Sequence, residues 1–187
     1  MKHWRFKGVM ALLLLATLPQ ASRATGWCGI LLLEFGHHQA ESTAPPNAWR
    51  GLLPLKSSRA DVERLLGSST GSVGDIYLYE TKDEKVRVVY SQGSCEPSLE
   101  GQWKVPADTL LSITVFPQSK VLVNSLRLDM TVYKRGQEMH PENWVWYVSP
   151  ENGVMVHAIQ KNTGEEVMST TYRPAKKDEN LKCPKQD

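Results

Sequence analysis

The sequence predicts an α+β fold in which short helices pack on an antiparallel sheet or sheets, with two similar halves in tandem as a candidate arrangement. Three observations support this class. Residues 58–67 have the pattern of a short amphipathic helix. Runs rich in β-branched and aromatic residues, the composition of strands, follow at residues 76–79, 85–90 and 110–116. A loosely similar order of strands and turns then recurs over residues 143–172.

The helix expected at residues 58–67 carries its own start and stop signals. Ser58 is a typical N-cap, and Asp61 three residues later can complete a variant capping box. Gly67 is placed to end the helix in the left-handed conformation. The apolar stripe consists of Val62, Leu65 and Leu66. Because a two-turn helix is too short to persist alone in water, we expect this stripe to be buried against the strands.

The strand at residues 85–90 is expected to have two different faces. One face carries Val86, Val88 and Tyr90, and the other carries Lys85, Arg87 and Val89. The run at residues 110–116 ends at Pro117, because proline cannot continue a central ladder.

The second half offers three further strands, at residues 143–148, 154–159 and 166–172. The segment before them, residues 125–134, leaves two interpretations open. Its apolar residues alternate as in a strand, while residues 129–135 also fit one helical turn. We expect one folded domain over residues 48–184, with halves at 48–118 and 119–184.

The pattern Ser-Arg-Ala-Asp-Val-Glu-Arg-Leu-Leu-Gly (58–67), followed by a meander of strands, resembles the repeat of the small outer-membrane assembly lipoproteins and the tandem β-lactamase-inhibitor proteins. The resemblance implies a helix packed on an antiparallel sheet and a non-enzymatic role. In the second half it extends only to the order of strands. The chain departs from the lipoproteins because bulky Trp27 precedes Cys28, and from the inhibitors in having one candidate disulfide instead of one per repeat. From residues 49–57 to 181–184, the body is also similar to uncharacterised secreted bacterial proteins.

The first 40 residues predict export. Basic residues precede a short apolar run, and Ser22-Arg23-Ala24 offers the small-x-small site that a signal peptidase cleaves. We therefore expect a signal peptide over residues 1–24, with cleavage as late as residue 40, and a linker over residues 25–47. An uncleaved N-terminal anchor is the alternative, although neither apolar run in this region reaches the roughly 20 residues of a spanning helix.

The charge of the chain argues against one class of function. The 22 Lys and Arg outnumber the 20 Asp and Glu, but residues 1–24 hold four basic residues and no acidic one, so the remainder has a net charge of −2. A nearly neutral protein with interspersed signs has no electrostatic footprint for nucleic acid or an anionic membrane. We expect no nucleic-acid binding, no transmembrane helix in the mature protein, and a secreted or periplasmic location.

Two cysteines remain in the expected domain, Cys95 and Cys183. In an oxidising compartment two cysteines allow one connectivity, which predicts a Cys95–Cys183 disulfide. Two free thiols are the alternative. Neither cysteine has a neighbouring histidine in the sequence, which disfavours a catalytic thiol.

The sequence contains no recognisable catalytic, cofactor or metal motif. It lacks the Gly-x-Ser-x-Gly elbow of hydrolases, and no Gly-Lys-Ser/Thr follows the glycine-rich residues 67–74, which are expected to form a loop. His140 and His157 lack the local spacing of zinc ligands, and His157 is expected on a strand surface. Acidic clusters are expected in solvated turns or tails, at residues 83–84, 138–142, 165–166 and 178–179. We therefore predict no catalytic, cofactor-binding or metal-binding residues.

Aromatic residues give the candidate binding surface. In a strand at residues 143–148, Trp144 and Trp146 point to one face and Tyr147 to the other. Indoles that face inward are packing residues, whereas two indoles that face outward form the kind of exposed patch that marks a binding site.

These observations predict an exported, non-catalytic binding or envelope-associated protein, whose partner is a protein or an envelope component. A secreted enzyme of unrecognised type is the alternative. A deep polar cleft with converging titratable groups would favour the enzyme, and a broad apolar-aromatic sheet face would favour the binding protein. A purely structural envelope component would have neither.

Overall fold

The computed structural model describes residues 46–93, 95, 102–137 and 143–184. All of them belong to one compact unit. The predicted signal peptide and most of the predicted linker lie outside the described residues, as do Cys28 and His140.

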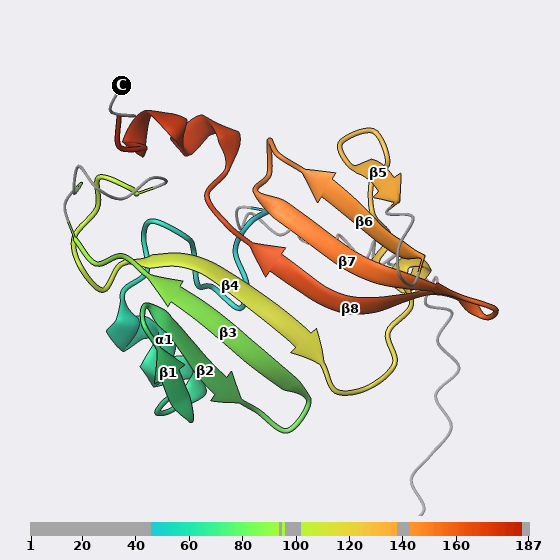
Figure 1. Ribbon diagram of the computed structural model, residues 1–187, viewed down its shortest axis with the longest axis horizontal. Helices are drawn as coiled ribbons and strands as arrows, with labels where there is room; N and C mark the ends of the chain where they lie inside the picture. The colour runs from blue at the N-terminus through green and yellow to red at the C-terminus, as the bar shows by residue number, and fades with distance from the viewer. Residues whose placement is uncertain (1–45, 94, 96–101, 138–142, 185–187) are drawn as a thin grey trace, which may run out of the picture. The chain divides into compact units, whose positions relative to one another are not determined.

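One antiparallel sheet of eight strands dominates the described part of the chain, in the order β1-β2-β3-β4-β8-β7-β6-β5 (Figure 1). The first four strands are β1 Gly71–Val73, β2 Ile76–Glu80, β3 Glu84–Tyr90 and β4 Leu110–Pro117. The last four are β5 Lys134–Gln137, β6 Trp144–Ser149, β7 Val154–Lys161 and β8 Gly164–Tyr172. The helical elements are α1 Arg59–Leu66 and two 3-10 helices, η1 Val123–Leu126 and η2 Lys176–Leu181. The antiparallel sheet is as predicted, but the fold is richer in sheet and poorer in helix than expected.

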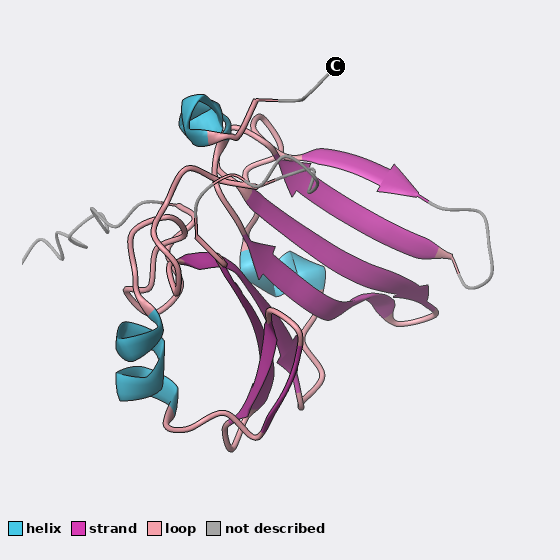
Figure 2. Cartoon of the chain, turned by 60° about the vertical axis from the view of Figure 1, so that its left-hand side comes forward, coloured by secondary structure: helices cyan, strands magenta, loops and turns pink. Residues whose placement is uncertain are grey.

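Each half of the sequence contributes four consecutive strands, and the last strand of each half lies at the middle of the sheet. There β4 and β8 pair through Ile113, Thr114 and Val115 alone, opposite residues 170–172. Beyond this short contact the two strands separate, and Figure 2 shows the two groups of strands turned relative to one another. The sheet is therefore continuous but strongly bent.

The helix α1 begins as predicted. The hydroxyl of Ser58 accepts a hydrogen bond from the amide of Asp61, whose carboxylate accepts one from the amide of Ser58, completing the capping box. Gly67 follows with φ 80° and ψ −166°, so it uses a positive φ but not the left-handed helical conformation that we expected. Its amide donates to the carbonyl of Glu63, which closes the last turn.

The apolar stripe of α1 was only partly predicted. Val62 is completely buried and Leu66 packs at the edge of the core, but Leu65 is 44% exposed, so its expected burial is wrong. Residues four apart lie one above the other on a helix, and α1 presents the pair Val62 and Leu66 to the sheet. Leu65 is turned about 100° from Leu66 and reaches solvent.

Two core clusters lie on the same side of the sheet, which we call the inner face. The first cluster packs beneath α1 and the entering chain, and comprises Trp49, Leu52, Val62, Tyr79, Val86, Val88, Tyr90, Leu110, Ile113 and Val115. The second packs beneath η1, and comprises Val123, Val145, Tyr147, Val156, Ala158 and Val167.

Residues 125–134, for which the sequence left a strand and a helical turn open, divide between three elements of the structure. Leu126 ends η1, Leu128 and Tyr133 pack on the second cluster from an irregular turn, and β5 begins at Lys134.

A disulfide joins Cys95 to Cys183, with 5.7 Å between the Cα atoms, as the cysteine count predicted. It ties the connection between β3 and β4 to the C-terminal segment. Backbone hydrogen bonds reinforce this tie, since the amide of Cys183 donates to the carbonyl of Gln102 at 2.9 Å and that of Lys104 to Leu181 at 2.7 Å. Near the start of the described residues, Asn47 is buried and donates to the carbonyl of Arg173, so packing begins within the segment assigned to the linker.

Candidate functional site

The sheet face opposite the two core clusters, which we call the open face, carries a continuous cross-strand row of side chains. Strand register places these residues opposite one another from β2 to β5. The row consists of Leu78, Arg87, Thr114, Thr171, Met155, Val148 and Lys134. Residues directly opposite on one face of a sheet are close enough to act together, so this row crosses the junction between the two groups of strands.

Trp144 and Trp146 both lie on the open face. Their neighbours Val145 and Tyr147 are buried in the second core cluster, and the alternation of a strand therefore turns both indoles away from it. Trp144 is 37% exposed, and Trp146 is half-buried. The sequence left open whether the two indoles face inward or outward, and in the structure they face outward.

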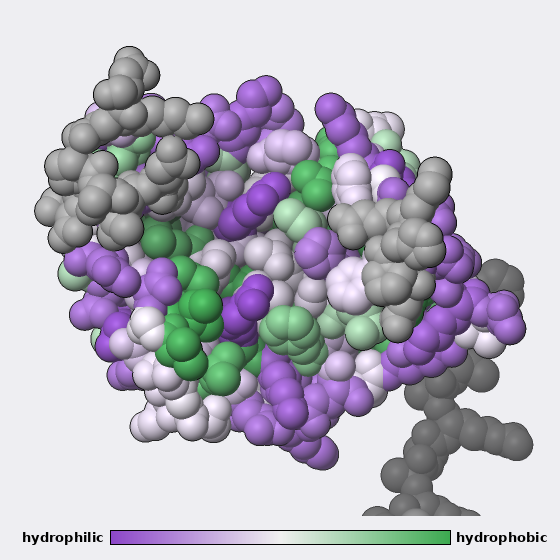
Figure 3. Space-filling model, viewed as in Figure 1, coloured by the Kyte–Doolittle hydropathy of each residue, from purple (hydrophilic) through white to green (hydrophobic). Residues whose placement is uncertain are grey.

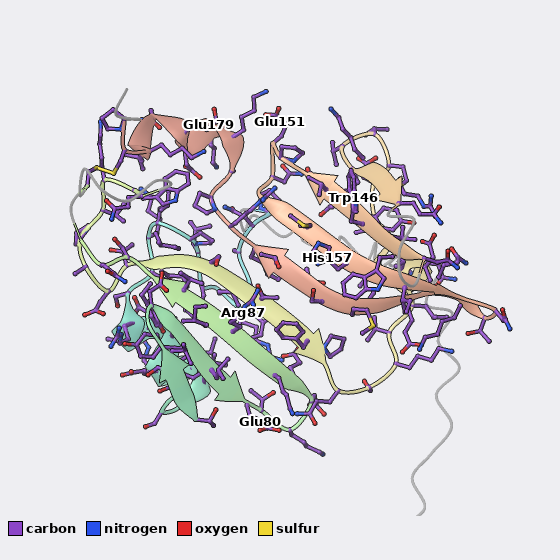
Figure 4. The ribbon with its side chains drawn as sticks, viewed as in Figure 1. Glu80, Arg87, Trp146, Glu151, His157 and Glu179 are labelled. Carbon is purple, nitrogen blue, oxygen red and sulfur yellow. A yellow bond between two sulfur atoms is a disulfide. The ribbon has the colours of Figure 1, made fainter. Side chains whose placement is uncertain are left out.

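The ring of Trp146 packs over a glycine. It pairs with Gly136 of the edge strand β5, and its ring occupies the space that a side chain at position 136 would need. An aromatic ring lying over a strand glycine covers backbone that the glycine leaves bare. On its other side Trp146 pairs with His157, which lies on the strand surface as predicted and pairs in turn with Ser169. Figure 4 shows Arg87, His157 and Trp146 following one another from β3 through β7 to β6.

Further exposed apolar side chains gather on the open face. They are Val73, Leu78, Phe116 and Met168, in addition to Trp144. Met168 reaches this face because the register shifts between His157 and Ala158, which leaves Met168 without a partner between Val167 and Ser169. Figure 3 shows apolar side chains gathered over the β1–β4 part of the sheet, with hydrophilic ones between them.

A hollow of about 470 Å³ lies in this part of the open face, between the side chains of β2, β3 and β4. Leu78 and Phe116 supply its apolar walls, and the guanidinium of Arg87 lies 5.9 Å from the centre of the Phe116 ring. Glu80 and Lys85 stand at its rim. This combination of apolar walls, one of them aromatic, with charged side chains beside them is suited to holding an apolar side chain of a partner.

The middle of the open face is polar. The hydroxyls of Thr114 and Thr171 hydrogen-bond at 3.1 Å across the β4–β8 junction. His157 is the one imidazole placed on this face among the described residues, and Ser169 beside it is buried. These groups can hydrogen-bond a partner.

The most interconnected ionic group lies on the inner side, at Glu165. This residue was expected in a solvated turn, but it belongs to β8 and its side chain is only 17% exposed. One carboxylate oxygen accepts from Arg135 at 2.7 Å, and the other accepts from the hydroxyl of Tyr147. Burial acts to raise the pKa of Glu165, but the hydrogen bonds from Tyr147 and Arg135 outweigh it and hold this pKa below its ordinary value.

The phenol of Tyr147 stays protonated for a related reason. Burial raises its pKa, and the adjacent Glu165 carboxylate raises it further by accepting its proton in a hydrogen bond. Tyr147, Glu165 and Arg135 therefore have fixed protonation states at neutral pH. The sequence offered no signal for this network, because Tyr147 and Glu165 are 18 residues apart and meet only through the sheet.

Among the described residues, no group of three or more His, Cys, Asp or Glu side chains is arranged to hold a metal ion. The helices of the described segments are all too short or too polar to cross a bilayer. No family model matches the chain, and no curated protein or solved structure matches it either.

Proposed function

We propose that this protein is an exported, non-catalytic binding protein, and that the open face binds its partner, a protein or an envelope component. One observation carries the proposal. Exposed apolar and aromatic side chains gather on the open face, although both core clusters lie on the other side of the sheet. Since these residues do not contribute to the core, their exposure calls for another explanation.

The composition of the open face supports binding over a purely structural role. Tryptophan, phenylalanine, methionine and arginine are enriched at the centres of protein interfaces, and this face presents each of them through Trp144, Phe116, Met168 and Arg87. Within the described residues, Arg87 makes no ion pair, and its contact is with the Phe116 ring. It is therefore available to a carboxylate of the partner.

Export is part of the same proposal. A signal peptide at residues 1–24 would bring the chain to an oxidising compartment, and the Cys95–Cys183 disulfide is compatible with one. Intact-mass measurement of protein isolated from its source tests this step. A mass that lacks at least residues 1–24 is expected, and a mature protein that retains Met1 would favour the uncleaved anchor.

The two halves of the sheet fit the proposed resemblance to the tandem helix-and-meander proteins. In the first half α1 packs on a core cluster that draws on β2, β3 and β4, and in the second half η1 packs on one that draws on β6, β7 and β8. We propose that residues 48–118 and 119–184 are two such units, of which the second has kept the strands and reduced the helix to one 3-10 turn.

The decisive experiment compares matched leucines. Leu78 on the open face and Leu65 on α1 are each 44% exposed, so an aspartate at either position adds the same charge at an equally exposed site. The mature domain is used to capture its partner from an envelope extract. Leu78→Asp and Trp144→Ser are expected to lose the partner that the unmodified protein captures, and Leu65→Asp to retain it. Loss with Leu65→Asp alone, or equal capture by all variants, would refute the proposed surface.

A further inference from the structure

A second cavity lies on the inner side of the sheet, away from the open face. It has a volume of about 470 Å³, within the range of small-molecule sites, and lies between the 122–130 segment and the hairpin of β7 and β8. One wall is largely apolar, formed by Leu122, Val123, Leu128 and Met130. The opposite wall is polar, formed by Tyr147, Gln160, Thr163, Gly164 and Glu165.

The charges around this cavity are not balanced. Glu165 is neutralised by Arg135, and both of its carboxylate oxygens already accept hydrogen bonds. Arg127 also lines the cavity, and its guanidinium makes no hydrogen bond or ion pair with any other described residue. The nearby Asp129 carboxylate accepts from Thr131 instead. Among the described residues, the cavity therefore offers one guanidinium that no carboxylate contacts, beside a largely apolar wall.

The backbone at Arg127 is unusual. With φ 49° and ψ 46° it adopts the left-handed conformation, which residues with a side chain occupy only at a cost in free energy. The flanking residues Leu126 and Leu128 both pack on the second core cluster, and they hold the chain in this turn. An asparagine or glycine would fit such a turn with less strain, yet the residue here is an arginine whose side chain borders the cavity.

We propose that this cavity binds a small amphipathic carboxylate, with its anionic group on the guanidinium of Arg127 and its apolar part against Val123, Leu128 and Met130. Arginine is well suited to this role, because its planar fork can donate two parallel hydrogen bonds to one carboxylate. On the polar wall, the protonated Tyr147 and the amide of Gln160 carry no charge. They can hydrogen-bond the ligand without repelling its carboxylate. This site is independent of the open face and of its partner.

Three probes of similar size test the proposal: 3-phenylpropionate, its neutral amide of the same shape, and the cationic 3-phenylpropylamine. Binding is followed by two-dimensional NMR of the full mature protein, observing the backbone amides of Gln160 and Gly164 and the methyl of Met130. The carboxylate is expected to give saturable shifts at these positions with a Kd of about 1 mM or tighter. The amide is expected to bind at least about tenfold more weakly, because it cannot form the charge-assisted pair, and the amine not to bind.

Variants then separate recognition from folding. Arg127→Gln is expected to weaken binding of the carboxylate about tenfold or more while leaving that of the amide unchanged, and Met130→Glu to weaken the carboxylate through charge repulsion. Arg64→Gln, an exposed arginine of α1, is the matched control and is expected to have no effect. The proposal is overturned by equal affinities for carboxylate and amide, by an equal loss of both in Arg127→Gln, by shifts confined to other regions, or by no saturable shift.

Discussion

Replacing Val62 with alanine tests how α1 stabilises the fold. Val62 is fully buried in the first core cluster, among Tyr79, Val86 and Val88. The substitution removes two methyl groups, which at about 0.8 kcal/mol per buried carbon is a transfer loss of about 1.6 kcal/mol. The cavity left under the helix adds to this loss, since the sheet beneath it cannot close the gap, so we expect a total of roughly 2–3 kcal/mol.

The matched control is Leu65→Ala in the same helix. Leu65 is exposed, and leucine and alanine have similar helix propensities, so the free energy of unfolding is expected to change by less than about 0.5 kcal/mol. Urea unfolding followed by tryptophan fluorescence measures both variants, with the slope of the transition checked for constancy. A change of less than about 0.5 kcal/mol for Val62→Ala, with a larger one for Leu65→Ala, would show that α1 does not pack through Val62, and the described orientation of the helix would be wrong.

Three further predictions concern the disulfide, the buried carboxylate and the glycine beneath the indole. Replacing Cys95 and Cys183 with serine is expected to lower the free energy of unfolding by on the order of 4–5 kcal/mol, because the bridge closes a loop with a sequence separation of 88 residues. Denaturant unfolding measures this loss, and an unchanged midpoint would contradict it. Glu165→Gln is expected to destabilise the fold at neutral pH. Because the pKa of Glu165 is lowered in the folded state, its charged form stabilises the fold above its ordinary pKa of 4.5, and the difference from the variant should shrink as the pH falls below that value; a difference independent of pH would refute this. Gly136→Ala is expected to displace Trp146 and to shift its fluorescence emission, whereas an identical spectrum would show that the ring does not lie over the glycine.

The features that the sequence predicted well are set by neighbours in the chain. The capping box of α1 depends on Ser58 and Asp61, three residues apart, and the alternation of β3 depends on residues two apart. The edge strands were missed for a related reason. β1 is three residues long and β5 is the polar sequence Lys-Arg-Gly-Gln, so each becomes a strand only because a longer strand pairs with it.

The candidate site shows the same division between local and distant causes. Strand alternation placed Trp144 and Trp146 on one face of β6. Which face of β6 is turned to the core depends on η1, which packs against Val145 and Tyr147. No local pattern reveals that choice, since either face of β6 is apolar enough to be buried. For the same reason Glu165 was expected in solvent, and only the register of β6, β7 and β8 brings it to Tyr147.

The central claim is that the open face contacts the partner, and site-specific photo-crosslinking tests it most directly. A photo-crosslinking amino acid is substituted for Trp144 on the open face, and in a second protein for Leu65 on α1. Both proteins are irradiated in the envelope extract from which the unmodified domain captures its partner. A covalent adduct with that partner is expected from position 144 and not from position 65, whereas an adduct from position 65 alone would contradict the assignment of the open face.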